Sequence, residues 1–322
     1  MRHVLGTVLT GVGAFVLVIG FLIRFYAAPR LIMAPTDAYQ VTRLRAEGAS
    51  YFDAKSLRLR KGATITATNT VRGDVLASHD GVAVWDSVTT VQDVARGYLI
   101  DIRTQRVAFD RRSGRLTSCC GAAVQGDVTA RQDGIGLFWP VDVTRRTYQL
   151  YDVQTRRAWP VVFQGEERVE GVRAYRFVQR IPATKVTEAV PDMPGEMLGL
   201  GKKRGGVPVD RYYEAEATYW VDPRTGAPID QRQRALSTLR AKTGPGRLVV
   251  ADLDLRMSPE TRRELIARSD DGAEKIRLVE TAVPLACGIA GLVALAAGLA
   301  ASPRGGRRAR PRREAERAAV AT

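Results

Sequence analysis

Hydrophobic residues are concentrated in two uninterrupted runs, one near each end of the chain. Val4–Ile23 and Ala282–Ala301 are each twenty residues long and contain no charged side chain. A helix of this length rises about 30 Å, which matches the hydrocarbon core of a bilayer. The pattern therefore predicts two transmembrane helices, at 4–23 and 282–301.

A cleaved signal peptide is the alternative interpretation of the first run. Its apolar stretch is longer than the roughly 7 to 15 residues of a signal-peptide core. Cleavage after Ala28 or Ala27 would place Tyr26 or Phe25 at a position that needs a small residue. We therefore expect the first run to be retained as a membrane anchor.

A cluster of basic residues after the second run predicts the orientation of the chain. Seven arginines occur between Arg304 and Arg317, and the whole chain carries a formal charge of +15. Basic residues beside a membrane span favour the cytoplasmic side. We predict a two-pass plasma-membrane protein in which 1–3 and 302–322 are cytoplasmic and 24–281 form an extracytoplasmic domain. The tail has no aromatic residue, so its partner is expected to be the bilayer and not nucleic acid.

Between the two runs, apolar and polar residues alternate in several segments. Alternation with a period of two is typical of strands with one buried and one solvated face. The pattern predicts a turn at Glu170-Gly171 and a hairpin turn from Asp222 to Gly226, and it divides Gly97–Arg115 into two runs around Thr104-Gln105. The segments that show it are Gly97–Arg115, Thr147–Val153, Ala158–Pro182, Tyr212–Leu236 and Arg247–Met257. The fold class is therefore mainly β, with a large antiparallel sheet flanked by two transmembrane helices.

Helical signals in the domain are scarce. Ser258 is a suitable N-cap for a helix over 258–270, and Pro259 fits its first turn. A short helix is also expected over Tyr39–Glu47. The segment Val190–Pro208 is rich in glycine and proline, which favours an exposed loop or a flap.

Glycines recur every seven residues in both apolar runs. This spacing places small residues on one helix face, where two backbones can approach closely. We hypothesise that the two spans pack together through these glycines. The alternative is that glycine is simply common in membrane helices. The glycines concerned are Gly6, Gly13 and Gly20 in the first run, and Gly291 and Gly298 in the second.

The three cysteines suggest one local feature. Cys287 falls within the second apolar run, where it is expected to be a packing residue, while Cys119 and Cys120 are adjacent. In an exported domain such a pair can form a vicinal disulfide, and Gly121 would help the chain to accommodate it. A structural bridge is the favoured interpretation and a redox role is the alternative. No histidine stands near the pair in the sequence to complete a zinc site.

Other candidate chemistry is weak, and no catalytic, cofactor-binding or metal-ligating residue is predicted. Ser78, His79 and Asp80 are sequence neighbours, whereas a catalytic triad is assembled from separate segments. Gly201-Lys202 lacks the remainder of a phosphate-binding loop, because Lys203 occupies the Ser or Thr position. Asp252 and Asp254 are too few ligands for calcium. The chain is not expected to be an enzyme.

Three motifs resemble an actinobacterial membrane-protein family often labelled the porin PorA family. They are the run "FDRRSGRLTSCCG", the segment "GVRAYRF" and the hairpin "WVDPRTGAP". The resemblance covers nearly the whole chain and implies an exported domain anchored in the plasma membrane. It brings no established catalytic residues.

The hairpins "VEGVRAYRFVQ" and "YWVDPRTGAPID" also look like the curved half-barrel sheets of bacterial lipid carriers of the LolA and LprG type. Such sheets hold an acyl chain in an apolar hollow. The leading hypothesis is therefore a binding or scaffolding module of the cell envelope, with a lipid or another apolar envelope ligand as its partner. A channel, as the family label suggests, is the alternative, and an envelope hydrolase is a third. The oligomeric state and the ligand are not predicted.

Overall fold

The structure is a computed structural model that describes residues 2–141, 143–201 and 205–301. The chain forms two compact units, which are described separately. The first combines the residues up to Arg30 with those from Arg277 onward, and the second is Leu31–Ile276. The predicted cytoplasmic tail, 302–322, and Lys202-Lys203 lie outside the described residues.

The first unit is helical. Its first part contains α1 (Arg2–Leu22), a π-helical turn (Ile23–Ala27) and α2 (Ala28–Leu31), and its second part contains another π-helical turn (Leu278–Ala282) and α4 (Val283–Ala301). Both apolar helices are long and apolar enough to cross a membrane. Helical structure therefore extends beyond the two predicted spans, and Arg24 and Glu280 form an ion pair at 3.9 Å in the π-helical turns. The domain boundaries stay a prediction.

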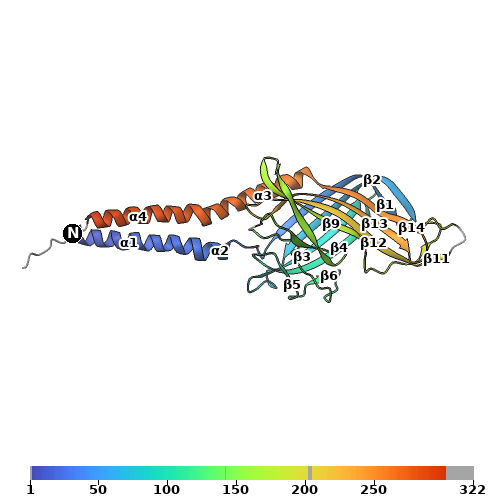
Figure 1. The fold of residues 1–322 in the computed structure, drawn as a ribbon, viewed down its shortest axis with the longest axis horizontal. Helices are drawn as coiled ribbons and strands as arrows, with labels where there is room; N and C mark the ends of the chain where they lie inside the picture. The colour runs from blue at the N-terminus through green and yellow to red at the C-terminus, as the bar shows by residue number, and fades with distance from the viewer. Residues whose placement is uncertain (1, 142, 202–204, 302–322) are drawn as a thin grey trace, which may run out of the picture. The chain divides into compact units, whose positions relative to one another are not determined.

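Glycines line the contact between α1 and α4, which run side by side in opposite directions (Figure 1). A methyl group added to Gly13 would lie 2.8 Å from the carbonyl oxygen of Gly291, and one added to Gly298 would lie 2.9 Å from that of Gly6. A methyl group on Gly20 would lie 2.8 Å from Cβ of Cys287. All five glycines singled out in the sequence are buried at this contact.

The second unit is dominated by one antiparallel sheet of twelve described strands, as the sequence predicted (Figure 1). The spatial order is β5-β4-β3-β2-β1-β14-β13-β12-β9-β8-β7, with β6 also paired to β4, and the sheet is curled into a half-barrel. A short β10-β11 pair stands apart from it. The strands are β1 (Tyr39–Asp53), β2 (Arg58–Gly73), β3 (Val82–Asp93), β4 (Tyr98–Asp110), β5 (Leu116–Thr117), β6 (Ala123–Val124), β7 (Tyr148–Asp152), β8 (Arg157–Val169), β9 (Val172–Lys185), β10 (Met193–Pro194), β11 (Gly206–Val207), β12 (Val209–Val221), β13 (Pro228–Ala241) and β14 (Arg247–Met257).

The two edges of the curled sheet are joined through two adjacent residues, Gly134 and Ile135. The amide of Leu116 on β5 donates to the carbonyl of Gly134 at 2.8 Å. On the other side, Ile135 donates to the carbonyl of Gln149 at 2.7 Å and accepts from the amide of Tyr151 at 2.9 Å. The backbone of one loop thus connects β5 to β7, so the half-barrel is closed at this level.

Local turn chemistry fixes the two predicted hairpins. Glu170 and Gly171 both have positive φ, which gives the tight turn between β8 and β9 the twist that antiparallel strands require. In the β12–β13 hairpin, the fully buried carboxylate of Asp222 accepts from the amide of Arg224 at 2.9 Å. At Gly226 a side chain would collide with the backbone of Pro140.

Two predictions of local structure are wrong. Tyr39–Glu47 forms the start of β1 rather than a helix, because both edges of this segment pair, one with β2 and the other with β14. Gly97–Arg115 contains one long strand, β4, instead of two runs. Thr104 and Gln105 simply continue its pairing with β3, opposite Val88 and Ser87.

Helix α3 (Pro259–Arg277) begins where the sequence predicts. The Ser258 hydroxyl accepts from the amide of Thr261 at 3.3 Å, which caps the helix. Side chains of α3 attach it to the sheet: Thr261 accepts from the amide of Arg43 at 3.3 Å, and Ser269 donates to Asp222 at 2.8 Å. The helix therefore packs firmly against one end of the curled sheet.

Candidate functional site

The concave side of the curled sheet encloses a cavity of about 650 Å³. This volume lies within the range of small-molecule sites, roughly 300 to 1,000 Å³. Alternate residues of the long strands β1, β2, β3, β9, β12 and β13 line it, because side chains two apart in a strand share a face. On β12, for example, Tyr213 and Ala217 line the cavity, whereas Glu214 and Glu216 are exposed.

An aliphatic patch forms part of the cavity wall. It consists of inward-facing residues of the adjacent strands β1, β14, β13 and β12, together with Leu265 on α3. The side chains of this patch cannot donate or accept a hydrogen bond, so the patch suits an apolar group. Its strand residues are Leu44, Leu253, Leu255, Ala235 and Ala217. The same strands also present polar side chains to the cavity, including Gln40, Gln231 and Gln233.

Amide and hydroxyl groups line other parts of the wall, among them residues of β2, β3 and β9. Asn69 donates to Ser87 at 2.7 Å and to Thr89 at 2.8 Å, and Gln179 donates to the carbonyl of Leu150 at 2.8 Å. These contacts hold the polar side chains in fixed orientations. The cavity wall therefore combines an aliphatic patch with hydrogen-bonding groups.

Two polar atoms on the cavity wall have no hydrogen-bond partner among the described residues. They are the hydroxyl of Tyr151 and Oε1 of Gln154, both shielded from solvent. Tyr151 is only 7% exposed, and burial raises the pKa of its hydroxyl to about 12. The neighbouring Asp152 is also desolvated, which raises the pKa of its carboxyl. Because buried polar groups are normally paired, this corner of the wall fits a polar group of a ligand.

An ion cluster lies at the other end of the cavity from α3. Glu188, in the segment after β9, accepts from Arg103 on β4 at 3.2 Å and from Arg211 on β12 at 3.0 Å. Arg103 also pairs with Asp101 at 3.0 Å. Burial raises the pKa of the Glu188 carboxyl, but the hydrogen bonds and charges of the two arginines outweigh this and lower it below the usual value.

The predicted loop after β9 adjoins this cluster. Val190 and Met193 line the cavity, and Leu198 is buried against Leu239 of β13. The beginning of the segment Val190–Pro208 therefore covers part of the cavity, which corresponds to the flap interpretation of its sequence.

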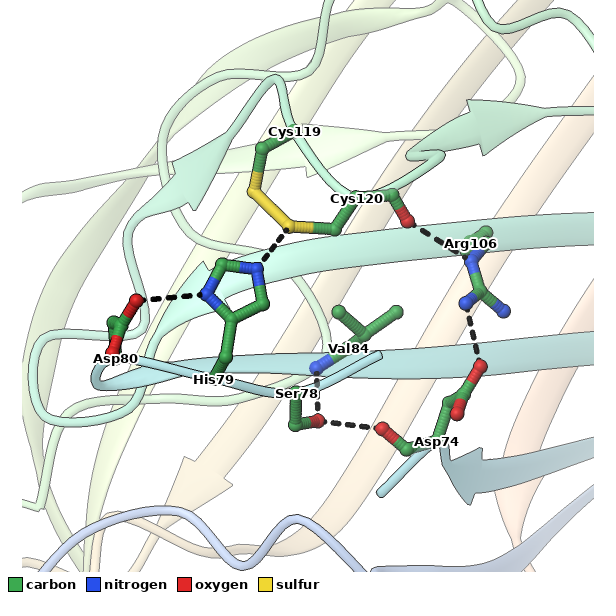
Figure 2. Close-up of a disulfide and its surroundings, with 8 residues drawn as sticks. All are labelled: Asp74, Ser78, His79, Asp80, Val84, Arg106, Cys119 and Cys120. Atoms are coloured by element: carbon green, nitrogen blue, oxygen red, sulfur yellow. Dashed lines mark hydrogen bonds and ion pairs between the residues drawn. A yellow bond between two sulfur atoms is a disulfide. The ribbon is translucent and has the colours of Figure 1, made fainter. Parts of the chain in front are cut away.

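A second feature lies outside the cavity, in the turn between β5 and β6. A disulfide joins Cys119 to Cys120, and both residues are partly exposed (Figure 2). The ring of His79 lies beside it, with Nε2 at 3.4 Å from Sγ of Cys120. The fold brings this histidine to the cysteine pair from 41 positions away in the sequence. The described residues contain no group of three or more potential metal ligands.

Ser78 does not complete a catalytic arrangement with His79 and Asp80. Its hydroxyl donates to the carbonyl of Asp74 at 2.6 Å and accepts from the amide of Val84 at 3.0 Å, so it stabilises the turn (Figure 2). Asp254 is similarly occupied, since it pairs with Arg232 at 2.7 Å.

The cavity residues were not identified from the sequence. The signal that marks them is a strand whose inward positions are polar, as in Asn69, Ser87 and Thr89. In β3 such positions break the apolar alternation by which strands are recognised. In β2 only Asn69 interrupts it, so the alternation over 63–71 could have revealed that strand. Tyr151 and Glu188 carry no local signal, because their partners lie in distant segments.

The fold and the cavity define a membrane protein whose antiparallel β domain curls around a ligand-sized hollow. The chain belongs to the porin PorA family, whose model matches residues 5–300. This confirms the resemblance drawn from the sequence motifs, whereas the likeness to LolA- and LprG-type carriers stays a prediction.

Two relatives carry the name Porin PorA. The protein from Corynebacterium resistens is 24% identical over 240 residues, which cover 56% of this chain and 57% of the relative. The protein from Corynebacterium amycolatum is 25% identical over 171 residues, which cover 46% of this chain and 42% of the relative. The chain thus spans about half the length of these relatives.

Proposed function

We propose that this protein is a two-pass plasma-membrane protein whose extracytoplasmic β domain binds an amphipathic, lipid-like ligand in the curled sheet. The cavity binds without a chemical step, as a binding or scaffolding module of the envelope. The ligand places its apolar part against Leu44, Leu253 and Leu255, and its polar part against Tyr151 and Gln154.

The mixed lining of the cavity carries this proposal. A hollow with an aliphatic wall alone would favour a hydrocarbon, and one with polar walls alone would favour a sugar or an ion. Here an aliphatic patch and two residues with buried polar atoms that have no partner among the described residues line one cavity of about 650 Å³. A ligand with an apolar and a polar part suits such a lining.

The test is a binding measurement on the full chain in lipid nanodiscs, with the fluorescent fatty acid cis-parinaric acid as the probe. Ala235 faces the cavity from β13, and the next residue, Arg234, is exposed. Ala235→Trp fills the cavity, while Arg234→Trp places the same ring one residue away on the other face of the strand.

We expect Ala235→Trp to abolish the saturable part of the fluorescence increase, and Arg234→Trp to retain it. Circular dichroism of both variants checks that they are folded. Equal probe binding by the two variants would show that the probe occupies the bilayer and not the sheet, which contradicts the proposal. Mass spectrometry of lipids released from the wild-type protein then identifies the natural ligand class.

A channel is the second candidate, because the family and both relatives are named porins. Outward-facing side chains of the sheet form ion pairs, at 2.7 Å between Arg180 and Glu216 and at 2.7 Å between Arg232 and Asp254. A lipid-facing barrel instead needs an apolar outer band. Conduction by this chain would therefore depend on assembly of the apolar helices.

Planar-bilayer recordings of the purified full chain separate the two candidates. Discrete conductance steps that persist in Ala235→Trp would support a channel independent of the cavity. Silent bilayers together with saturable probe binding would support the ligand-binding proposal.

A further inference from the structure

The turn that carries the Cys119–Cys120 disulfide is held in an unusual backbone conformation. Cys120 and Gly121 have φ values of 59° and 74°, in the left-handed region that a residue with a side chain rarely adopts. The amide of Ala122 donates to the carbonyl of Cys119 at 2.9 Å and closes the turn. The fold thus presents both sulfur atoms at a partly exposed site (Figure 2).

His79 is positioned by a separate turn, between β2 and β3. Its amide donates to the carbonyl of Val82 at 3.1 Å, and its own carbonyl accepts from the Val82 amide at 2.7 Å. The imidazole Nδ1 lies 3.4 Å from a carboxylate oxygen of Asp80, and Nε2 faces Cys120. With Nδ1 oriented by the carboxylate, Nε2 is the nitrogen that is free to exchange a proton with sulfur.

Arg106 connects the two turns. Its guanidinium donates to the carbonyl of Cys120 at 3.4 Å, to Asp74 at 2.6 Å and to Asp86 at 2.7 Å. Asp74 stands at the start of the turn that carries His79. Arg106 therefore holds the His79 turn through Asp74 and the disulfide turn through Cys120, which keeps the imidazole close to the disulfide (Figure 2). Two carboxylates neutralise the guanidinium, and the imidazole of His79 is the ring that contacts the sulfur of Cys120.

A disulfide between sequence neighbours contributes little to the stability of the fold. In the chain-entropy account, stabilisation grows with the number of residues in the closed loop, and here the loop is the smallest possible. A structural role therefore does not explain the pair well. Exposed sulfurs beside a proton donor are instead typical of a reactive site.

We propose that Cys119–Cys120 is a redox-active pair that undergoes thiol–disulfide exchange with a dithiol, and that His79 provides the proton. A thiolate of the dithiol attacks Sγ of Cys119 and breaks the sulfur–sulfur bond. Cys120 leaves as a thiolate and takes a proton from Nε2 of His79. The second thiolate of the dithiol then attacks the dithiol sulfur that is bonded to Cys119. This breaks the mixed disulfide, and Cys119 leaves as a thiolate. The dithiol leaves as a disulfide, and the Cys119 thiolate is protonated by water. The two protons that the dithiol released to water on forming its thiolates replace the proton taken up by Cys119 and the one donated by His79, so overall two electrons and two protons pass from the dithiol to the cysteine pair.

The test follows reduction of the folded full chain by dithiothreitol, as a mass shift after trapping of free thiols with a maleimide. We expect the disulfide to be reduced without loss of the native circular dichroism spectrum. We expect His79→Gln to slow reduction by at least about tenfold, because it removes the proton donor to the leaving sulfur. The ratio of wild-type to variant rate should be larger near pH 5 than near pH 8, the interval in which histidines lose their charge.

Two further variants separate this role from a structural one. Arg112→Gln removes an exposed charge from the adjacent β4–β5 turn and should leave the rate unchanged. The double variant Cys119→Ser with Cys120→Ser should keep the wild-type melting temperature. The proposal is overturned if His79→Gln is reduced with the wild-type rate and pH profile. It is overturned equally if the disulfide resists excess dithiothreitol until the chain unfolds, or if the double variant loses its fold.

Discussion

Glu188 accepts a hydrogen bond of 3.2 Å from Arg103 across the end of the curled sheet. Arg103 lies on β4, near one edge of the sheet order, while Glu188 belongs to the segment that leaves β9, near the other. The carboxylate also reaches Arg211 of β12 at 3.0 Å. One acidic side chain thus links two parts of the half-barrel that share no backbone hydrogen bond.

Neutralising this carboxylate should weaken the fold in a pH-dependent way. The pKa of Glu188 is lowered in the folded state, so its contribution is present above the ordinary glutamate pKa and is lost as pH falls through the folded value. At neutral pH we expect Glu188→Gln to reduce the free energy of unfolding by about 1 kcal/mol, since a charge-assisted pair becomes a neutral one. Denaturant unfolding at pH 7 and below about pH 4 measures the difference, which should shrink in acid.

The control for this variant is Glu214→Gln, on the exposed face of β12. It should leave stability at pH 7 within the error of the measurement. A Glu188→Gln protein with unchanged stability at pH 7 would contradict a role for the ion cluster in holding the cavity end.

Two tyrosines of the cavity should respond in opposite ways to loss of their hydroxyl. The Tyr151 hydroxyl has no partner among the described residues, whereas that of Tyr213 accepts from Gln233 at 2.9 Å. We expect Tyr213→Phe to cost about 1 kcal/mol, because it breaks a hydrogen bond and leaves the Gln233 amide unpaired. Tyr151→Phe should leave the ligand-free protein equally or more stable.

For the affinity of the ligand we expect the opposite order, with Tyr151→Phe having the larger effect. Tyr151→Phe should weaken binding of cis-parinaric acid by about tenfold, the equivalent of one hydrogen bond of about 1.4 kcal/mol. Unfolding curves and fluorescence titrations on the same two preparations check both statements. An unstable Tyr151→Phe protein with unchanged probe affinity would refute the assignment of the polar corner.

The glycine contact between the apolar helices should be sensitive to side-chain size on one face only. A Cβ at Gly13 would meet the backbone of α4, while one at Gly11 would meet nothing within 4 Å. We propose that the helices associate through this contact. Gly13→Leu should therefore separate them at a cost of about 1–3 kcal/mol, and Gly11→Leu should have no effect.

A cysteine cross-link reports on this association. Gly20 lies against Cys287, so Gly20→Cys creates a pair that can be joined by oxidation in membranes. The added Cβ would lie 2.8 Å from that of Cys287, so the helices must shift slightly, and this shift is common to all variants compared in this background. In that background we expect the cross-linked fraction to fall on addition of Gly13→Leu and to persist on addition of Gly11→Leu. Equal yields from both would mean that the glycines do not determine helix association.

The orientation of the chain has its own test. The arginines after α4 predict that both termini are cytoplasmic. A fluorescent protein fused after Thr322 should be fluorescent in cells, and alkaline phosphatase fused at the same position should be inactive. Active phosphatase would place the tail outside the cytoplasm and would reverse the proposed position of the β domain.

Features that depend on neighbouring residues were predictable from the sequence. An uncharged run of twenty residues specifies a helix that can span a membrane whatever surrounds it. Glu170-Gly171 and Asp222–Gly226 specify turns, because positive φ and side-chain capping are properties of the local chain. Ser258 fixes the start of α3 for the same reason.

Two strands of the cavity wall, β1 and β3, are hard to recognise in this way. Gln40, Thr42, Ser87 and Thr89 occupy inward positions that are apolar in an ordinary sheet. Their side chains face a hollow rather than a packed core. Alternation is therefore weak in β1, where the sequence predicts a helix, and interrupted in β3. In β2 the run 63–71 alternates apolar residues with threonine, interrupted only at Asn69, so this strand carries a recognisable signal.

The sequence by itself determined that this protein has two apolar helices long enough to span a membrane, an antiparallel β domain and an adjacent cysteine pair, because each of these follows from composition or spacing within a short segment. Only the tertiary structure decided which residues surround the cavity, which arginines hold Glu188, and that His79 stands beside Cys120. Those relationships arise from strand order and curvature, which bring together residues separated by tens of positions and leave no periodic signal in the chain.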